Sequence, residues 1–268
     1  MRVSAAERAV SYAVLLFAAV IALYPLVIIL VTALRPDQVG AAGGLHPENF
    51  AEAWRRGNFG TYLRNSLIVS ACVVAVSTVL SCLTGYAFGC MRFRGSTVLF
   101  YLLLIGLMVP SEAIVVPLYY DLRSLGLTDT YLSLILPQVA QSLAFGTFWM
   151  RAYFRGSSRE VVEAARLDGA GHFRILTGIL LPMGRPAVLT MALLFFMWTW
   201  NEFLLPLVMI TDESLRTAPL GLSNFQGQYT SGTALLAAAA VLVALPVVVV
   251  FLLTQRHFIR GMVEGAVK

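Results

Sequence analysis

Residues 9–34 read AVSYAVLLFAAVIALYPLVIILVTAL, and no charged side chain occurs between Arg8 and Arg35. A helix needs about 20 mostly apolar residues to cross about 30 Å of hydrocarbon, so this stretch of 26 residues is long enough. It is also longer than the apolar region of a cleaved signal peptide, which has about 7–15 residues. We therefore expect a membrane-spanning helix near residues 10–33.

The composition of the whole chain supports the same environment. Apolar residues make up 59% of the 268 positions and charged residues 12%, with a mean hydropathy of +0.80. Soluble domains carry about 45–50% apolar and roughly 25% charged residues. A compact soluble domain is therefore excluded, and the chain is expected to be an integral membrane protein.

Five further apolar runs follow the first. A polar stretch from Arg35 to Arg64 separates them from it, and Pro110 and Pro117, with Gly106, are expected to bend the third span. The sequence thus predicts one all-α transmembrane domain over residues 1–268. Its six spans are expected near residues 10–33, 66–90, 97–119, 130–150, 187–210 and 232–253.

The basic residues predict the orientation of these spans. An even number of spans places both termini on one side, and that side carries thirteen of the 19 basic residues. Six of the thirteen lie between Arg151 and Arg185, whereas the opposite side carries the remaining six. Because cytoplasmic loops are enriched in Lys and Arg, we expect both termini and the loop at residues 155–182 to be cytoplasmic.

Several kinds of chemistry have no residues to support them. The only lysine is Lys268, so no phosphate-binding loop of the form GxxxxGK[ST] is present. The three cysteines lack CxxC spacing, and the three histidines lie in separate segments, so we expect no metal site. No nucleophile–base set is recognisable either. The chain is expected to be a transport subunit without catalytic residues or a cofactor of its own.

The loop at residues 155–182 carries the most specific pattern. Ser157 and Glu160 have the spacing of a capping box, and Gly169 stands where a helix would end. A helix from about Ser158 to Gly169 is too polar to span a membrane. Val161, Ala164 and Ala165 would form a low-profile strip that another protein can approach, with charges at its rim from Glu163, Arg166 and Asp168. The alternative is an amphipathic helix that rests on the membrane surface.

This loop resembles a known family. Glu163-Ala164-Ala165, then Gly169, then Ile179-x-Leu181-Pro182, is similar to the EAA loop of ABC importer permeases, and every fixed position matches. The string EAARLDGA at residues 163–170 is similar to the carbohydrate-uptake branch. Asn65-Ser66, Trp200-Asn201-Glu202-Phe203 and the C-terminal stretch from Gln255-Arg256 to Gly265-Ala266-Val267-Lys268 resemble the smaller (second) membrane subunit of the maltose type. The resemblance covers nearly the whole chain.

The resemblance implies a fold, a location and a set of partners. The chain would have the type I ABC importer permease fold and lie in a bacterial plasma membrane. It would pair with a second homologous permease, while an ABC ATPase dimer binds ATP and Mg²⁺ and an extracytoplasmic solute-binding protein delivers a sugar or sugar-like solute. The ATPase-coupling residues would then be Glu163, Ala164, Ala165, Asp168, Gly169 and Pro182.

Two carboxylates lie within predicted spans, where ionisable groups are costly and usually functional. Glu202 lies beside Trp200, Asn201 and Phe203, and Glu112 follows Pro110. These five residues are candidates for the translocation pathway, although a structural or gating role for the 200–203 motif is the stronger expectation. A competing hypothesis is an ion- or proton-coupled secondary transporter that uses Glu112 and Glu202 as a relay. The identity of the solute stays open among a disaccharide, an oligosaccharide, an amino sugar and a glycerol phosphate.

Overall fold

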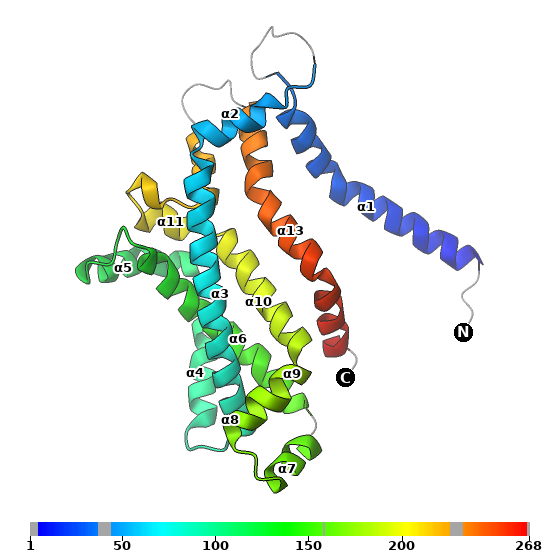
Figure 1. Ribbon diagram of the computed structural model, residues 1–268, viewed down its shortest axis with the longest axis vertical. Coiled ribbons are helices and arrows are strands. Elements are labelled where there is room, and N and C mark those ends of the chain that lie inside the picture. The colour runs from blue at the N-terminus through cyan, green and yellow to red at the C-terminus, as the bar shows by residue number, and fades with distance from the viewer. Residues whose placement is uncertain (1–4, 37–43, 158, 226–232, 267–268) are drawn as a thin grey trace. The chain divides into compact units, whose positions relative to one another are not determined.

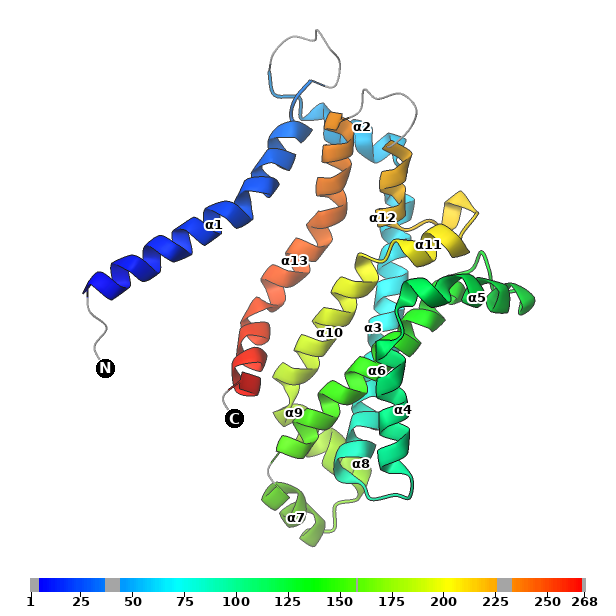
Figure 2. The same cartoon turned by 180° about the vertical axis from the view of Figure 1, so that it is seen from behind.

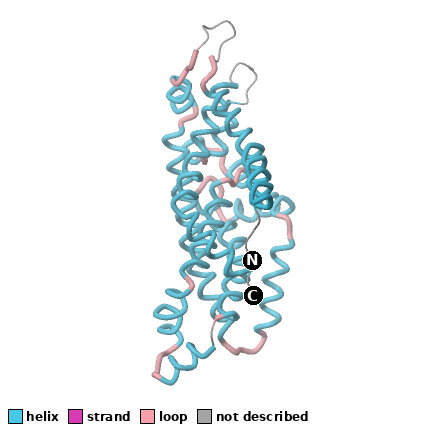
Figure 3. Tube along the Cα trace, turned by 90° about the vertical axis from the view of Figure 1, so that its right-hand side faces the viewer, coloured by secondary structure: helices cyan, strands magenta, loops and turns pink. Residues whose placement is uncertain are grey.

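The computed structural model describes residues 5–36, 44–157, 159–225 and 233–266, and within these ranges it contains helices and loops but no strand (Figure 3). The prediction of an all-α protein is confirmed. The α-helices are α1 (Ala5–Ala33), α2 (Glu48–Arg56), α3 (Phe59–Cys90), α4 (Ser96–Met108), α5 (Ser111–Ser124), α6 (Tyr131–Gly156), α7 (Arg159–Leu167), α8 (His172–Ile175), α9 (Leu181–Met183), α10 (Arg185–Trp200), α11 (Leu204–Met209), α12 (Ala218–Gly221) and α13 (Thr233–Ala266) (Figure 1). A π-helical turn occupies Leu176–Leu180, and 3₁₀ turns occupy Glu213–Leu215 and Leu222–Phe225.

The chain divides into two compact units, residues 1–60 with 221–246 and residues 61–220 with 247–268. In the first unit, α1 is apolar along its length and buries none of its spanning window within the chain. Asn49 on α2 joins α2 to the end of α1, since its amide donates to the carbonyls of Ala33 (2.9 Å) and Arg35 (2.8 Å). An uncovered apolar helix of this length is expected to face lipid or another membrane protein.

The second unit has two buried apolar clusters. One lies toward the α7–α9 end and includes Tyr86, Met150, Phe154, Leu180 and Phe195. The other includes Val69, Val73, Leu134 and Met209 and joins α3, α5, α6 and α11. These two clusters hold the elements of the candidate site in place.

Three helices among the described residues are long and apolar enough to cross a membrane, over Glu7–Ala33, Phe59–Cys90 and Thr233–Gln255. Two bent helix pairs, α4 with α5 and the segment His172–Met183 with α10, raise that number to as many as five. The remaining predicted span corresponds to α6, whose 26 residues are long enough but include Gln138 and Gln141.

The third span is bent, as its prolines predicted, whereas the fifth span is interrupted where a continuous helix was expected. Helices α4 and α5 meet at an angle of 100° around Pro110, so the break lies there, and Pro117 continues within α5 (Figure 2). Pro110 is in the extended conformation, with a ψ of 131°. The fifth span ends at Trp200 and resumes as the short helix α11 at Leu204.

Helices α3 and α6 run in the same direction and pack closely at glycines. A Cβ atom at Gly146 would lie 2.0 Å from Ser81 Oγ, and one at Gly85 would lie 2.5 Å from Met150 Cβ. The hydroxyls of Thr84 and Thr147 are 2.6 Å apart in the same seam. The close packing expected of small residues in membrane helices therefore occurs within this chain.

Candidate functional site

Helix α7 occupies Arg159–Leu167, and Gly169 lies just beyond its last residue, where the sequence predicted the helix to stop. Gly169 has a φ of +79°, a conformation that favours glycine. Its N–H donates to Arg166, and the N–H of Ala170 donates to Ala165, which together form a Schellman motif. The Ser157 hydroxyl donates to the carbonyl of Tyr153 at 3.0 Å, which ties it to the end of α6. The capping box expected of Ser157 and Glu160 stays a prediction, since residue 158 lies outside the described residues.

The two faces of α7 differ. Glu163, Ala164 and Asp168 are exposed, while Ala165 is only 7% exposed and belongs to the buried cluster. The prediction of one open strip is therefore wrong for Ala165, because its methyl group packs against its own chain. Leu167, which the sequence interpretation passed over, is 89% exposed. The surface open to another protein thus combines a carboxylate, a small side chain and a large apolar one.

A partly buried contact links the segment after α7 to α3. The Tyr86 hydroxyl lies 2.9 Å from His172 Nδ1 at the start of α8, and the Tyr86 ring packs edge-on against Phe154. The residues of this contact lie far apart in the sequence, and no local pattern indicated it. The hydrogen bond between Tyr86 and His172 therefore attaches α8 to the spanning helix α3.

The segment from α8 to α9 meets α10 at a sharp bend. Pro182 is exposed in α9 and lines an open groove of about 930 Å³ with Leu181 and Phe173. The π-helical turn directly precedes α9, and such turns are found where a helix is strained or functional. Gly184 then allows the 81° bend into α10, because a Cβ there would lie 2.5 Å from the Tyr153 ring. The loop motif therefore ends where α10 begins.

The motif at residues 200–203 forms the break between α10 and α11. The Asn201 side-chain amide donates to the carbonyl of Met197 at 2.7 Å. The same carbonyl also accepts the Asn201 backbone N–H at 3.2 Å, so the side chain adds a second hydrogen bond at the end of α10. Glu202 Oε1 accepts a hydrogen bond of 3.0 Å from the N–H of Leu205 in the first turn of α11. Trp200 is buried and Phe203 is exposed. Asn201 and Glu202 thus hydrogen-bond to backbone groups of the break itself, and the structural or gating role expected of this motif stays a prediction.

One cavity brings the two predicted intramembrane carboxylates together. Its volume is about 410 Å³, and its lining includes Glu112 from the first turn of α5 and Glu202 from the α10–α11 break. Ser111 and Gln141 add polar groups that the sequence interpretation did not name. The rest of the lining is mostly apolar, from α4, α5, α6 and α11. Trp200, Asn201 and Phe203 are not among the lining residues.

Among the residues that the structure describes, no three His, Cys, Asp or Glu side chains cluster closely enough to hold a metal ion.

The side chains of Cys82 and Cys90 lie in or against the buried apolar cluster near α7–α9. The C-terminal stretch that contributed to the family resemblance falls largely outside the described side chains.

The fold and this loop define a multi-helix membrane protein with a short polar helix at one end. Residues 77–264 match the family described as the binding-protein-dependent transport system inner membrane component. The chain belongs to this family of membrane permeases. The resemblance found in the sequence is confirmed, and the secondary-transporter alternative finds no support in these matches.

Individual relatives match over most of their length. The arabinooligosaccharides transport system permease protein AraQ of Halalkalibacterium halodurans is 33% identical over 262 residues, which cover 94% of this chain and 93% of that protein. The trehalose transport system permease protein SugB of Mycobacterium tuberculosis is 32% identical over 254 residues, 92% and 93% of the two chains. A chain from a bacterial ABC transporter that imports the acidic polysaccharide alginate superposes with a TM-score of 0.77 at 23% identity, covering 96% of this chain and 99% of that one. That likeness establishes the fold.

Proposed function

We propose that this chain is the permease subunit of an ABC importer that moves a sugar or sugar-like solute into the cytoplasm, driven by a separate ATPase. The observation that carries the proposal is the construction of α7. One face of this helix is exposed through Glu163, Ala164 and Leu167, while the other is anchored through Ala165 to the helices of the same chain. A helix with one face exposed to a partner and the other packed on its own chain can transmit a movement of that partner to the membrane-spanning helices.

The coupling residues divide into two groups. Glu163, Ala164 and Asp168 would contact the ATPase, with Glu163 providing the main polar contact. Ala165 and Gly169 would hold α7 at its angle, and Pro182 would lie on the path toward α10. ATP and Mg²⁺ would bind to the ATPase, which leaves this chain without a cofactor.

Two observations support the proposal that the solute is a sugar: the names of the relatives and the lining of the cavity that contains Glu112 and Glu202. Relatives include permeases named for arabinooligosaccharides, trehalose and diacetylchitobiose. The cavity between the two broken spans combines apolar walls with the carboxylates of Glu112 and Glu202, and carboxylates accept hydrogen bonds from hydroxyls. An exposed carboxylate at membrane depth is costly in lipid, so Glu112 would face a pathway or the second permease.

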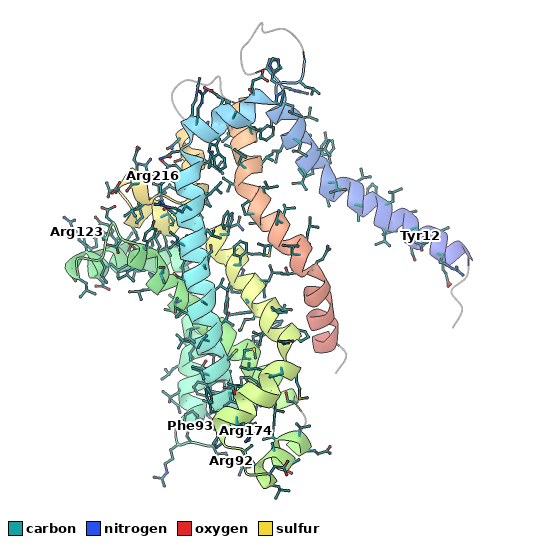
Figure 4. All side chains as sticks on the ribbon, viewed as in Figure 1. Tyr12, Arg92, Phe93, Arg123, Arg174 and Arg216 are labelled. Atoms are coloured by element: carbon teal, nitrogen blue, oxygen red, sulfur yellow. The ribbon has the colours of Figure 1, made fainter. Side chains whose placement is uncertain are left out.

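The orientation follows from the basic residues. Arg92 and Arg174 lie at the end of the second unit that carries α7, whereas Arg216 lies toward the opposite end and Arg123 lies on α5, which projects from the side between them (Figure 4). The first pair belongs to the basic side of the predicted topology, so the α7 end would be cytoplasmic, as would both termini. Single cysteines at positions 174 and 44, in a chain whose native cysteines are replaced by Ala, test this. In whole cells an impermeant thiol reagent should label position 44 and spare position 174, and the reverse pattern would contradict the assignment.

The function is tested with the complex reconstituted in proteoliposomes. The chain is purified together with its partner permease, ATPase and solute-binding protein, and uptake of radiolabelled sugars is measured with and without ATP inside the vesicles. We expect uptake that requires both ATP and the binding protein. Uptake that follows a proton gradient in the absence of ATP would instead support a relay through Glu112 and Glu202.

A further inference from the structure

The connection between α11 and α12, residues 210–217, is held by side chains of other segments. It lies at the end of the second unit opposite α7, where Arg216 is found (Figure 4). The backbone N–H groups of Thr211 and Asp212 donate to Asp129 Oδ1, at 2.5 and 2.9 Å. Such bonds fix the path of a surface segment that has little regular structure of its own.

Asn65 on α3 is the most deeply buried of these anchors, with none of its surface exposed. Its amide nitrogen donates to the carbonyls of Ser214 at 2.8 Å and Arg216 at 2.9 Å. Its amide oxygen accepts a hydrogen bond of 2.7 Å from the Tyr131 hydroxyl on α6. Both donors and the acceptor of one side chain are thus engaged, and the three bonds link the 210–217 connection and α6 to α3.

The neighbouring residue extends the same attachment. Ser66 Oγ accepts a hydrogen bond of 2.8 Å from the N–H of Ala218, which begins α12. A short helix leaves its first N–H groups without partners, so this bond also satisfies the start of α12. Asn65 and Ser66 together hold both sides of Thr217.

Asp129 provides a second, separate anchor. It adopts a φ of +54°, and its own N–H donates to the carbonyl of Met209 at 3.1 Å, at the end of α11. The N–H groups of Asp212 and Thr211 hold the pKa of the Asp129 carboxyl below its usual range. The carboxylate form that accepts these bonds is therefore favoured.

The anchored connection presents polar groups outward. Thr211, Asp212, Glu213 and Ser214 are exposed, and the Glu213 side chain is 74% exposed while pairing with Arg216 at 3.0 Å. A segment whose backbone is held by α3 and Asp129 and whose residues 211–214 are exposed is suited to contact another protein. Binding to such a segment loses less conformational entropy than binding to a flexible loop.

We propose that Asn65 is a positioning residue that holds residues 210–217 as a preformed docking surface for the extracytoplasmic solute-binding protein. This inference rests on the proposed function and assigns Asn65 a role in it. Asn65 itself touches neither the solute nor the partner. It acts through the backbone of Ser214 and Arg216, and Tyr131 keeps its amide in the required orientation.

The test uses the purified permease–ATPase complex in nanodiscs and its solute-binding protein, saturated with the ligand it carries from the cell. ATPase activity is measured as the binding-protein concentration is raised. Asn65→Leu preserves the size of the side chain and removes all three hydrogen bonds. We expect the concentration for half-maximal stimulation to rise about tenfold, equivalent to about 1.4 kcal/mol of binding free energy. The basal and maximal rates should stay unchanged.

Two further variants keep the result interpretable. Tyr131→Phe removes one hydrogen bond without disturbing the backbone contacts, so it should fold and raise the half-maximal concentration about threefold. Gln138→Met is the matched control, because Gln138 is also a buried amide, 5% exposed, and it donates to Leu134 within its own helix. This variant should respond to the binding protein like the wild type. Amide hydrogen exchange should also be faster at Ser214 and Ala218 in Asn65→Leu and unchanged in Gln138→Met.

The outcomes separate the inference from the function beneath it. If the wild type responds to the binding protein and both Asn65→Leu and Tyr131→Phe respond at the same concentration, the positioning role is overturned and the importer function stands. A shift in Gln138→Met as large as that in Asn65→Leu would likewise overturn it, since any buried amide would then have the same effect. If the wild-type complex holds no ATPase and shows no stimulation, the proposed function itself fails and the inference falls with it.

Discussion

The seam between α3 and α6 permits a quantitative test at Gly146. In Gly146→Ala the added Cβ would lie 2.0 Å from Ser81 Oγ, 2.6 Å from Ser81 Cβ and 2.8 Å from Phe195 Cζ. Atoms cannot approach this closely, so α3 must move away from α6 or the side chains must leave their preferred rotamers. Overpacking of this kind costs about 1–3 kcal/mol. A cost of about 2 kcal/mol lowers the Tm of a chain of this size by about 4–8 °C.

The assay is thermal unfolding of the purified complex, followed by intrinsic fluorescence. Gly106→Ala is the control, because a Cβ at that helical position has nothing within 4 Å, and the variant should be as stable as the wild type or slightly more stable. Ser81→Gly should restore most of the stability lost in Gly146→Ala, because it removes the two closest atoms and the Ser81 hydroxyl is buried without a partner. A Tm for Gly146→Ala equal to that of the wild type would refute the proposed packing of α3 on α6.

Three other substitutions test separate parts of the structure. Glu202→Gln keeps an oxygen that can accept from Leu205, so ATP-driven uptake should stay near the wild-type level, and its abolition in an assembled complex would favour a proton relay. Gly169→Ala places a side chain at a φ of +79° in open space, so it should destabilise the end of α7 by about 1–2 kcal/mol, measured as faster hydrogen exchange at Ala170. Asp129→Asn should lower the Tm at pH 7, and the difference should shrink as the pH falls below about 4, because a carboxyl with a depressed pKa stabilises the fold only while it is ionised. A difference that is independent of pH would show that the charge of Asp129 has no such role.

Much of the architecture could be predicted from local patterns. Charge-free runs of sufficient length predict α1, α3 and α13 because the bilayer requires an apolar surface at every turn. Gly169 was recognised as a helix end because few other residues adopt its conformation at low cost. Pro110 was recognised as a site of bending for a similar local reason. Each of these features depends on residues that are adjacent in the sequence.

Features that depend on tertiary contacts could not be predicted in this way. Ala164 and Ala165 are identical neighbours in the sequence, and only the position of α7 against its own chain makes one exposed and the other buried. The contact between Tyr86 and His172 joins distant segments without a local signal. The break at Asn201 interrupts an otherwise apolar run that contains no proline between α10 and α11, so hydropathy alone predicted a continuous span there.

The most direct test of the central claim uses this pair of alanines. Ala164→Asp changes only the exposed face of α7, so the Tm of the permease should change by little, since most exposed substitutions alter stability by about 0.5 kcal/mol or less. Ala165→Asp buries a charge without a partner and should destabilise the permease itself, which makes it the contrasting variant. The decisive measurement is the amount of ATPase that co-purifies with Ala164→Asp, together with its ATP-driven uptake. We predict that both fall at least about tenfold while the permease stays folded, as expected when one interface position costs about 1.4 kcal/mol or more. Normal uptake with the ATPase still bound would contradict the assignment of α7 as the coupling helix.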